Sequence, residues 1–171
     1  MYFSPGAVTG KTKAKSIASV LVLRKSCSGP GSLGWQSPLR QYVHFGGIYT
    51  DDLAKSLGGS QIALGFLRRE NRDDYTQRTF EIPACGGLML MERTARQEAL
   101  FRDGEEAVFF DPDDPTDLFT KVRELLADPA RRARIRAAGA AAVHRLKATY
   151  DDRIDRLLDL YAARGGAAVT V

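Results

Sequence analysis

The sequence contains little cysteine and little histidine, with two residues of each among 171. Cys27 and Cys85 are too few for a disulfide framework or a structural zinc site, so we expect a reduced, cytoplasmic protein without a bound metal. No serine or cysteine nucleophile motif accompanies His144, which we place at the surface of a helix. The composition therefore gives no support to a hydrolase triad.

The sequence also lacks a long apolar run. Its longest candidate near the start, residues 17–23, follows three lysines but has only seven residues and ends at Arg24. A membrane-spanning helix needs about 20 apolar residues, and a signal peptide needs a longer apolar segment than this one. Neither a membrane span nor export is predicted.

Acidic residues are missing from the first 50 positions, which hold six of the 25 lysines and arginines and none of the 21 acids. The net charge of +4 thus comes from a basic leader joined to a slightly acidic domain, which argues against a nucleic-acid partner. We divide the chain into a basic, Gly/Ser-rich leader of uncertain order (1–45), one domain (46–163) and a tail (164–171).

The middle of the chain reads as a β-α-β unit. Residues 61–67 are short and apolar, as expected of a buried strand, and residues 88–91 read as the next strand. Between them Asp73 or Asp74 is positioned to cap a helix, with Gln77 in the place of a capping box, and Pro83 and Gly86 mark its end. The pattern predicts an α/β fold with a parallel sheet and flanking helices.

Two carboxylates in this unit, Asp73 and Glu81, are separated by seven residues. If both lie on one helix they are about 12 Å apart along its axis. Carboxylates that flank one scissile glycosidic bond lie roughly 5 to 10 Å apart, so this spacing favours contacts at two points on an elongated ligand.

Three segments carry a resemblance to a known family: ALGFLRRENRDDYTQRTFEIPACGG, LFRDGEEAVFFDPDDPTDL and LLADPARRARIRAAG. Over residues 49–161 the chain resembles the C-terminal half of group 1 glycosyltransferases, most closely the spore-maturation (CgeB-like) branch. The resemblance implies the Rossmann-like C-terminal domain of a GT-B enzyme, followed by C-terminal helices. It also implies a nucleotide-diphosphate sugar as donor substrate, no separate cofactor and no required metal.

In that family a glutamate pair spaced E-x7-E holds the donor. Carried over, Asp73 takes the first place, near the sugar, as the candidate catalytic residue, and Glu81 takes the second, on the ribose hydroxyls. Asp73 has a shorter arm than glutamate and could equally be a helix cap, while Glu81 could instead pair with Arg78 within its helix. The remaining candidate donor-binding residues are Arg78, Arg72, Arg68 and Asn71, of which the loop arginines could equally be solvated.

We expect glycosyl transfer with retention of configuration to an unknown acceptor. The alternatives are a truncated, inactive donor-binding remnant and a protein-interaction module. The resemblance covers only the donor side of such an enzyme, so the acceptor domain is expected to be missing from this chain.

The C-terminal third predicts three helices. Asp114 and Pro115 begin the first, Asp128 and Pro129 the second, and residues 150–163 form the last. The arginines at 131, 132, 134 and 136 read as a solvated face. The apolar stripe of the last helix predicts partial exposure, self-association or contact with a missing acceptor domain.

Overall fold

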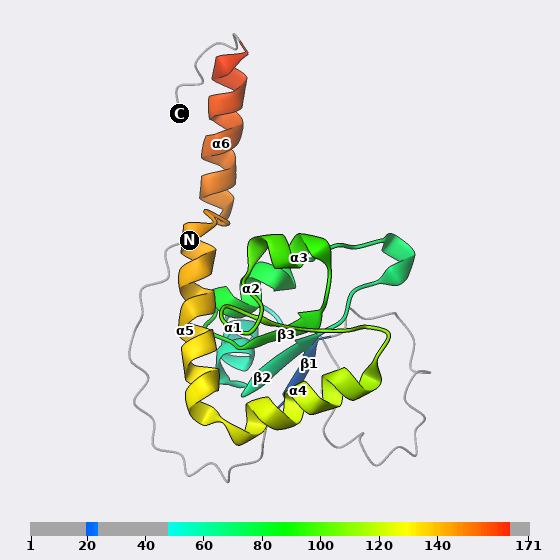
Figure 1. Cartoon of the computed structure of the whole chain (residues 1–171). Helices are drawn as coiled ribbons and strands as arrows, with labels where there is room; N and C mark the ends of the chain where they lie inside the picture. Colours follow the sequence, from blue (N-terminus) through cyan, green and yellow to red (C-terminus); the bar gives the residue numbers. More distant parts are fainter. Residues whose placement is uncertain (1–19, 24–47, 165–171) are drawn as a thin grey trace, which may run out of the picture.

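The computed structural model describes residues 20–23 and 48–164 (Figure 1). Its elements follow one another as β1 (Val20–Leu23), α1 (Thr50–Gly59), β2 (Ile62–Gly65), a 3₁₀ turn η2 (Arg69–Asn71), α2 (Arg78–Ala84), β3 (Met89–Glu92), α3 (Ala95–Leu100), β4 (Val108–Phe110), α4 (Pro115–Ala127), α5 (Pro129–Arg145) and α6 (Tyr150–Ala163).

The four strands form one parallel sheet in the order β1-β2-β3-β4. Leu64 lies beside Leu90, which in turn lies beside Val108. Every residue of β2 and β4 is buried, because helices cover both faces of the sheet, as is usual for parallel sheets. The predicted α/β fold with a Rossmann-like parallel sheet and flanking helices is confirmed.

β1 comes from the segment that the sequence analysis treats as a leader. Its four residues pair in register with β2, so part of the leader belongs to the sheet. The rest of residues 1–45 and the tail beyond Arg164 lie outside the described residues, and the domain boundary at residue 45 stays a prediction.

Side chains of the strands alternate between two apolar clusters, one on each face of the sheet. The first cluster contains Ala63, Met89, Met91 and Phe109 from the strands. The second contains Ile62, Leu64, Leu90, Val108 and Phe110. Helix α5 contributes to both, with Ala142 and Val143 in the first and Ile135 in the second.

The predicted starts of α4 and α5 are confirmed. The Asp114 carboxylate accepts the Thr116 N–H at 2.8 Å, and the Asp128 carboxylate accepts the Arg131 N–H at 2.8 Å, each with proline at the first helical position. Aspartate satisfies a free N–H there and proline lacks the N–H that would be unpaired. The Asp-Pro pairs therefore determine where α4 and α5 begin.

The predicted start of α2 is wrong. The helix begins at Arg78, and its N-cap Gln77 makes no side-chain capping bond. Asp73 and Asp74 lie in the preceding loop, and the helix start is held instead by Thr79, whose hydroxyl accepts the Thr76 N–H at 3.2 Å. Asp73 and Glu81 therefore do not share a helix, and the 12 Å estimate does not apply.

The run of arginines in α5 is only partly a solvated face. Arg132 donates to the carbonyls of Leu125 and Leu126, and Arg136 donates to those of Gly86 and Gly58. These carbonyls lie at the C-terminal ends of α4, α2 and α1, where the last carbonyls of a helix lack partners within it. Arg132 and Arg136 thus cap neighbouring helices, while Arg134 is exposed as expected.

Glu106 is a buried carboxylate whose charge is compensated by two arginines. It is 3% exposed and accepts the backbone N–H of Arg102 at 3.0 Å, the Arg102 guanidinium at 2.8 Å and that of Arg145 at 2.9 Å. Burial raises the pKa of Glu106, but the bonds from Arg102 and the charge of Arg145 outweigh it, so the pKa lies below its usual value. A carboxyl with a lowered pKa stabilises the fold above its unfolded pKa of about 4.3, and this stability is lost as the pH falls through the folded pKa.

We therefore expect Glu106→Gln to lower the free energy of unfolding at pH 7 and to flatten its decline below about pH 4.3. Urea unfolding at pH 7, 5, 4 and 3 measures both effects. Glu105→Gln is the matched control, because Glu105 is exposed and also pairs with Arg102 at 3.3 Å. Equal acid sensitivity of the two variants would contradict the role of Glu106.

Helix α6 projects from the body of the domain (Figure 1). Its bounds agree with the prediction, and Thr149 and Asp152 form a capping box at its start. No residue of α6 is buried, so the predicted exposure of its apolar stripe is confirmed. None of the helices in residues 48–164 is long and apolar enough to cross a membrane.

Candidate functional site

The carboxyl ends of the strands lead into the segments that carry the candidate residues. β2 continues into the loop of residues 66–77, and β3 ends at Glu92, followed by the Thr94 cap of α3. The Glu92 carboxylate accepts the Leu67 N–H at 3.1 Å, which ties the ends of β2 and β3 together. Ligands of open parallel sheets bind outside these carboxyl ends.

A buried polar network fixes α2 against α3. Thr79 and Gln97 are fully buried, and the Thr79 hydroxyl donates to the Gln97 side-chain oxygen at 3.4 Å. The Gln97 amide donates in turn to the Glu92 carbonyl at 2.9 Å. The Thr94 hydroxyl donates to the Asp74 carbonyl at 2.7 Å, so the loop before α2 is held as well. The first turn of α2, which carries Arg78 and Glu81, is therefore rigidly positioned.

Glu81 lines a cavity of about 340 Å³ between α2 and the junction of α5 with α6. This volume lies at the lower end of the range for small-molecule sites, roughly 300 to 1,000 Å³. The lining side chains are mainly apolar and aromatic. They are Tyr75, Gln77, Phe80, Glu81, Ala84, Val143, Ala148, Thr149, Tyr150 and Arg153.

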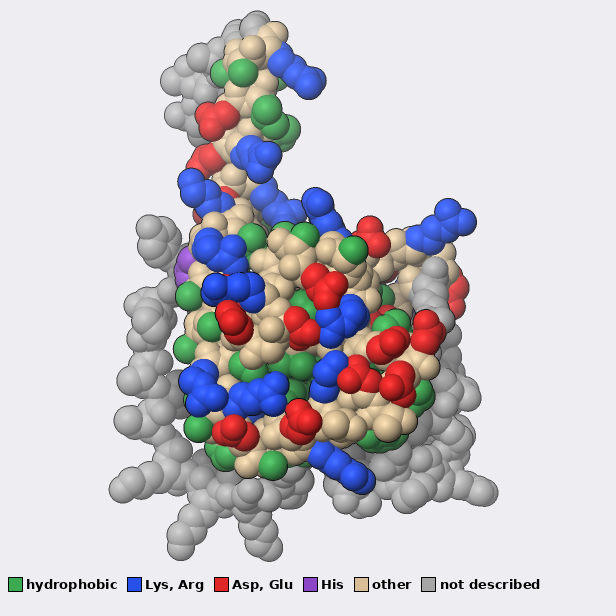
Figure 2. All heavy atoms as spheres, viewed as in Figure 1, with side chains coloured by type: hydrophobic (Ala, Val, Ile, Leu, Met, Phe, Trp, Pro, Cys, Tyr) green, Lys and Arg blue, Asp and Glu red, His purple; other side chains and the backbone are tan. Residues whose placement is uncertain are grey.

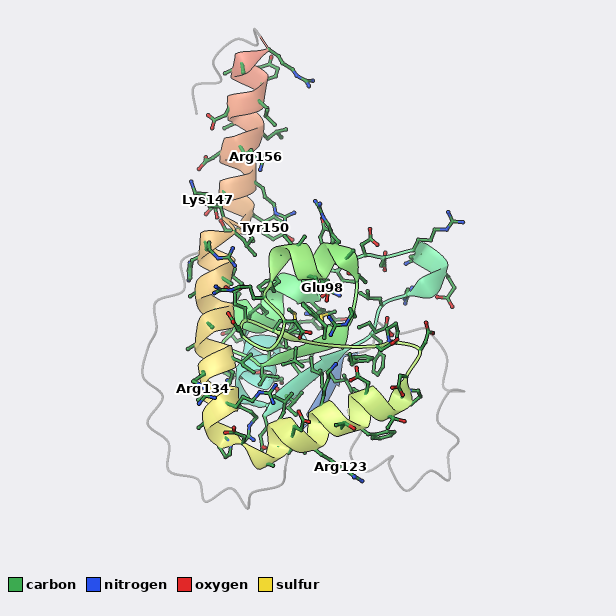
Figure 3. The ribbon with its side chains drawn as sticks, viewed as in Figure 1. Glu98, Arg123, Arg134, Lys147, Tyr150 and Arg156 are labelled. Carbon is green, nitrogen blue, oxygen red and sulfur yellow. The ribbon has the colours of Figure 1, made fainter. Side chains whose placement is uncertain are left out.

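The cavity is closed on one side by the start of α6, where Tyr150 lies (Figure 3). The Gln77 amide donates to the Tyr150 hydroxyl at 3.2 Å, and the Arg153 guanidinium lies 5.4 Å from the centre of the Phe80 ring. Phe80 also meets Tyr75 edge to face at 5.8 Å. Aromatic faces beside one carboxylate suit a ligand with a flat ring and hydroxyl groups.

A second cavity of about 610 Å³ shares four lining residues with the first, namely Tyr75, Phe80, Ala148 and Arg153. Five basic and three acidic side chains line it. The basic ones are Arg96, Arg145, Lys147, Arg153 and Arg156, and the acidic ones are Asp152, Asp155 and Asp159. Figure 3 shows Lys147 just before the start of α6 and Arg156 about halfway along it.

The structure brings together only some of the predicted site residues. Arg78 and Glu81 form an ion pair one turn apart on α2. Arg68, Asn71, Arg72 and Asp73 lie instead in the loop after β2 and do not line the cavity beside Glu81. In that loop the Arg68 carbonyl accepts the N–H groups of Asn71 and Asp73, and Arg72 adopts a left-handed backbone with φ of 54°.

Sequence reasoning missed Phe80, Tyr150 and Arg153 as cavity residues. Phe80 stands next to Glu81 in the sequence and could have been noticed there. Tyr150 and Arg153 follow Glu81 by about 70 positions, and only the fold brings α6 to α2.

Cys85 follows Glu81 by one helical turn, in the C-cap of α2. Burial and the neighbouring Glu81 carboxylate raise the pKa of its thiol, although Arg78 opposes them. Because the thiolate is the reactive form, Cys85 is unsuited to be a nucleophile at neutral pH. Among the described residues, no group of three or more His, Cys, Asp or Glu side chains could hold a metal ion.

Comparison with known proteins gives two results. A family described as "Glycosyl transferase-like" matches residues 13–159, so the match begins within the basic leader. D-inositol 3-phosphate glycosyltransferase of Thermomonospora curvata is 36% identical over 91 residues, which are 53% of this chain. The matched part is 20% of the length of that relative.

Proposed function

Because the chain belongs to the glycosyl transferase-like family, we propose that it binds the nucleotide-diphosphate sugar donor of a glycosyl transfer reaction. The observation that carries this proposal is the position of Glu81, a carboxylate in the wall of an aromatic-lined cavity between α2 and the junction of α5 with α6. Glu81 would accept hydrogen bonds from the ribose hydroxyls, and the ring of the nucleoside would lie against Phe80 and Tyr75.

The ion pair with Arg78 supports this role for Glu81 rather than replacing it. Both side chains remain about one third exposed, at 37% for Arg78 and 29% for Glu81. A carboxylate accepts more than one donor, so Glu81 can keep Arg78 and still take the two hydroxyls of a ribose. Arg78 would then hold the Glu81 carboxylate in one orientation.

The diphosphate would occupy the adjoining cavity. Its basic side chains outnumber the acidic ones, and Arg96 and Arg156 make no ion pair with other described residues. Fixed positive groups stabilise the charge that develops on a leaving diphosphate, which is the main help a protein gives to such a transfer. Arg68, Asn71, Arg72 and Asp73 line neither cavity, so donor contacts from them stay a prediction from the resemblance.

The FEIPACGG stretch, residues 80–87, supports assignment to the spore-maturation (CgeB-like) branch. In that branch the acceptor would be held by a second domain, so this chain would contribute the donor half of the site.

We expect Glu81→Ala to weaken nucleotide-diphosphate binding by about tenfold to a hundredfold. Hydrogen bonds to a charged group contribute roughly 1.5 to 3 kcal/mol, and a loss of that size corresponds to this change in the dissociation constant. Calorimetry of the purified chain with UDP, GDP, dTDP, ADP and their sugars identifies the base and gives the affinity of each variant. Glu124→Ala is the matched control, since Glu124 also pairs with an arginine, Arg131, but lies on α4 away from both cavities.

The results of these binding measurements decide whether the chain has a donor site. Binding that is lost in Glu81→Ala and kept in Glu124→Ala supports the donor site. Absence of binding from a folded chain contradicts it. Donor hydrolysis or transfer to added sugars would distinguish an active domain from a domain that only binds the donor.

A further inference from the structure

Helix α6 is joined to the body of the domain, residues 50–145, by a short hinge. The C-cap of α5 is Leu146 and the N-cap of α6 is Thr149, so only Lys147 and Ala148 lie between them. Lys147 adopts a left-handed backbone with φ of 48°, which turns the chain at the end of α5. Because no residue of α6 is buried, a change in the angle between α5 and α6 uncovers none of the apolar core.

Both cavities of the candidate site lie between α6 and the body. Five charged side chains of α6 line the larger cavity, namely Asp152, Arg153, Asp155, Arg156 and Asp159. Tyr150 and Arg153 line the smaller one. The opposite wall comes from α2, α3 and α5 in the larger cavity and from α2 and α5 in the smaller one. A ligand in either cavity therefore contacts α6 on one side and the body on the other.

Basic groups stand on both walls of the larger cavity. Arg96 on α3 and Arg145 on α5 belong to the body, whereas Arg153 and Arg156 belong to α6. Figure 2 shows basic side chains gathered in the corner where α6 leaves the body. The acids of this cavity all lie on α6, so an anion first meets a body wall that carries only positive charge. An anion bound there accepts hydrogen bonds from both walls and joins α6 to α3.

The contacts that hold α6 against the body are weak ones. The Gln77 amide donates to the Tyr150 hydroxyl at 3.2 Å, but Tyr150 is 72% exposed, so water competes for this bond. The Arg153 guanidinium lies 5.4 Å from the centre of the Phe80 ring, and such contacts contribute little at exposed sites. We call the position that has both contacts the docked position of α6.

We propose that α6 is a movable wall of the donor site, which leaves the docked position in the free chain and is held there when a diphosphate binds between Arg96 and Arg156. This inference rests on the proposed donor site. A ligand that contacts both walls binds the docked position more tightly than any other, so it shifts α6 towards that position.

Hydrogen exchange of the full chain, followed by mass spectrometry, measures the docking of α6. Inorganic pyrophosphate is the probe, because it needs only the larger cavity. Amides of residues 150–159 should exchange rapidly in the free chain. At a pyrophosphate concentration 100 times its dissociation constant their exchange should slow by at least about tenfold, with a limit of about a hundredfold set by linkage. Helix α4 is the internal reference, since it lines neither cavity and its exchange should not change.

Arg156→Gln separates binding from docking. Pyrophosphate should still bind this variant through the body wall, with lower affinity, but the exchange of residues 150–159 should no longer slow. Arg134→Gln is the matched control, because Arg134 is exposed on α5 and lines neither cavity. It removes the same charge and should keep both the binding and the slowed exchange.

Tyr150→Phe tests the coupling from the other side. Tyr150 does not line the larger cavity, so its hydroxyl affects pyrophosphate only through the position of α6. Loss of its bond with Gln77 should weaken pyrophosphate binding by about twofold to tenfold, the range expected for one hydrogen bond. Tyr161→Phe is the control, since Tyr161 also lies on α6 but lines neither cavity.

The outcomes distinguish this inference from the proposed donor site. Binding of pyrophosphate or of a nucleotide that leaves the exchange of residues 150–159 unchanged overturns the movable wall, and the donor site stands. Equal pyrophosphate affinities of Tyr150→Phe and Tyr161→Phe overturn it as well. A folded chain that binds neither pyrophosphate nor any nucleotide in calorimetry overturns the donor site and the movable wall together.

Discussion

Replacing Phe109 by alanine is expected to lower the free energy of unfolding by about 3 to 5 kcal/mol, a large part of the 5 to 15 kcal/mol typical of a domain. Phe109 is fully buried in β4 and belongs to the apolar cluster that also holds Met91, Phe101 and Ala142. Its removal leaves a ring-sized cavity that the close-packed strands and helices cannot fill.

The backbone bonds of Phe109 remain in this variant, so the loss can be assigned to the side chain. The Phe109 N–H donates to Asp103 at 3.0 Å, and its carbonyl accepts Lys121 at 2.7 Å and Arg93 at 3.1 Å. Urea unfolding at pH 7 measures the change, with Phe119→Ala as the control because Phe119 is exposed. A loss below 1 kcal/mol for Phe109→Ala would contradict the described packing of β4.

Gly139→Ala in α5 is expected to destabilise the fold by about 1 to 3 kcal/mol. A Cβ atom at position 139 would lie 2.5 Å from the Glu106 carbonyl oxygen and 3.4 Å from Pro83 Cβ. The obstacle at 2.5 Å is a backbone atom, so α5 itself must shift to relieve it. The higher helix propensity of alanine, worth up to about 1 kcal/mol, offsets only part of this cost.

Gly59→Ala is the comparison for this prediction. Gly59 ends α1, and nothing lies within 4 Å of the position its Cβ would take. The same substitution there should be neutral or stabilising by up to about 1 kcal/mol. Thermal unfolding of both variants measures the contrast, and equal melting temperatures would show that α5 does not approach Glu106 as closely as described.

The elements that the sequence predicted well are those with strong local signals. β2 and β3 are short apolar runs, and α4 and α5 begin at Asp-Pro pairs, so pattern and capping chemistry agree. The start of α2 was missed because Asp73 and Asp74 resemble capping residues, whereas the Thr79 side chain holds the Thr76 N–H three positions before it. The sequence alone does not show whether the two aspartates or the Thr76–Thr79 pair begins the helix, because both are short-range side-chain to backbone hydrogen bonds of similar strength.

The site was predictable only where it is local. Arg78 and Glu81 lie one turn apart, and their pairing follows from helix geometry. The grouping of Phe80, Tyr150 and Arg153 depends on how α6 leaves α5, and no local pattern encodes that direction. The hydrogen bonds from Arg136 to the carbonyls of Gly58 and Gly86 are equally non-local. For this reason the sequence pattern of four clustered arginines predicted a solvated face.

Helix α5 packs against both apolar clusters, so the packing on one face of the sheet cannot be lost without that on the other. Ile135 packs in one apolar cluster and Ala142 in the other, while Arg136 holds the ends of α1 and α2. Opening α5 therefore uncovers both clusters and releases two further helices at once, so residues 50–145 should unfold as one cooperative unit. α6, in which no residue is buried, should unwind at a lower free-energy cost than that unit, with the loss of the Gln77–Tyr150 hydrogen bond and the Arg153–Phe80 contact.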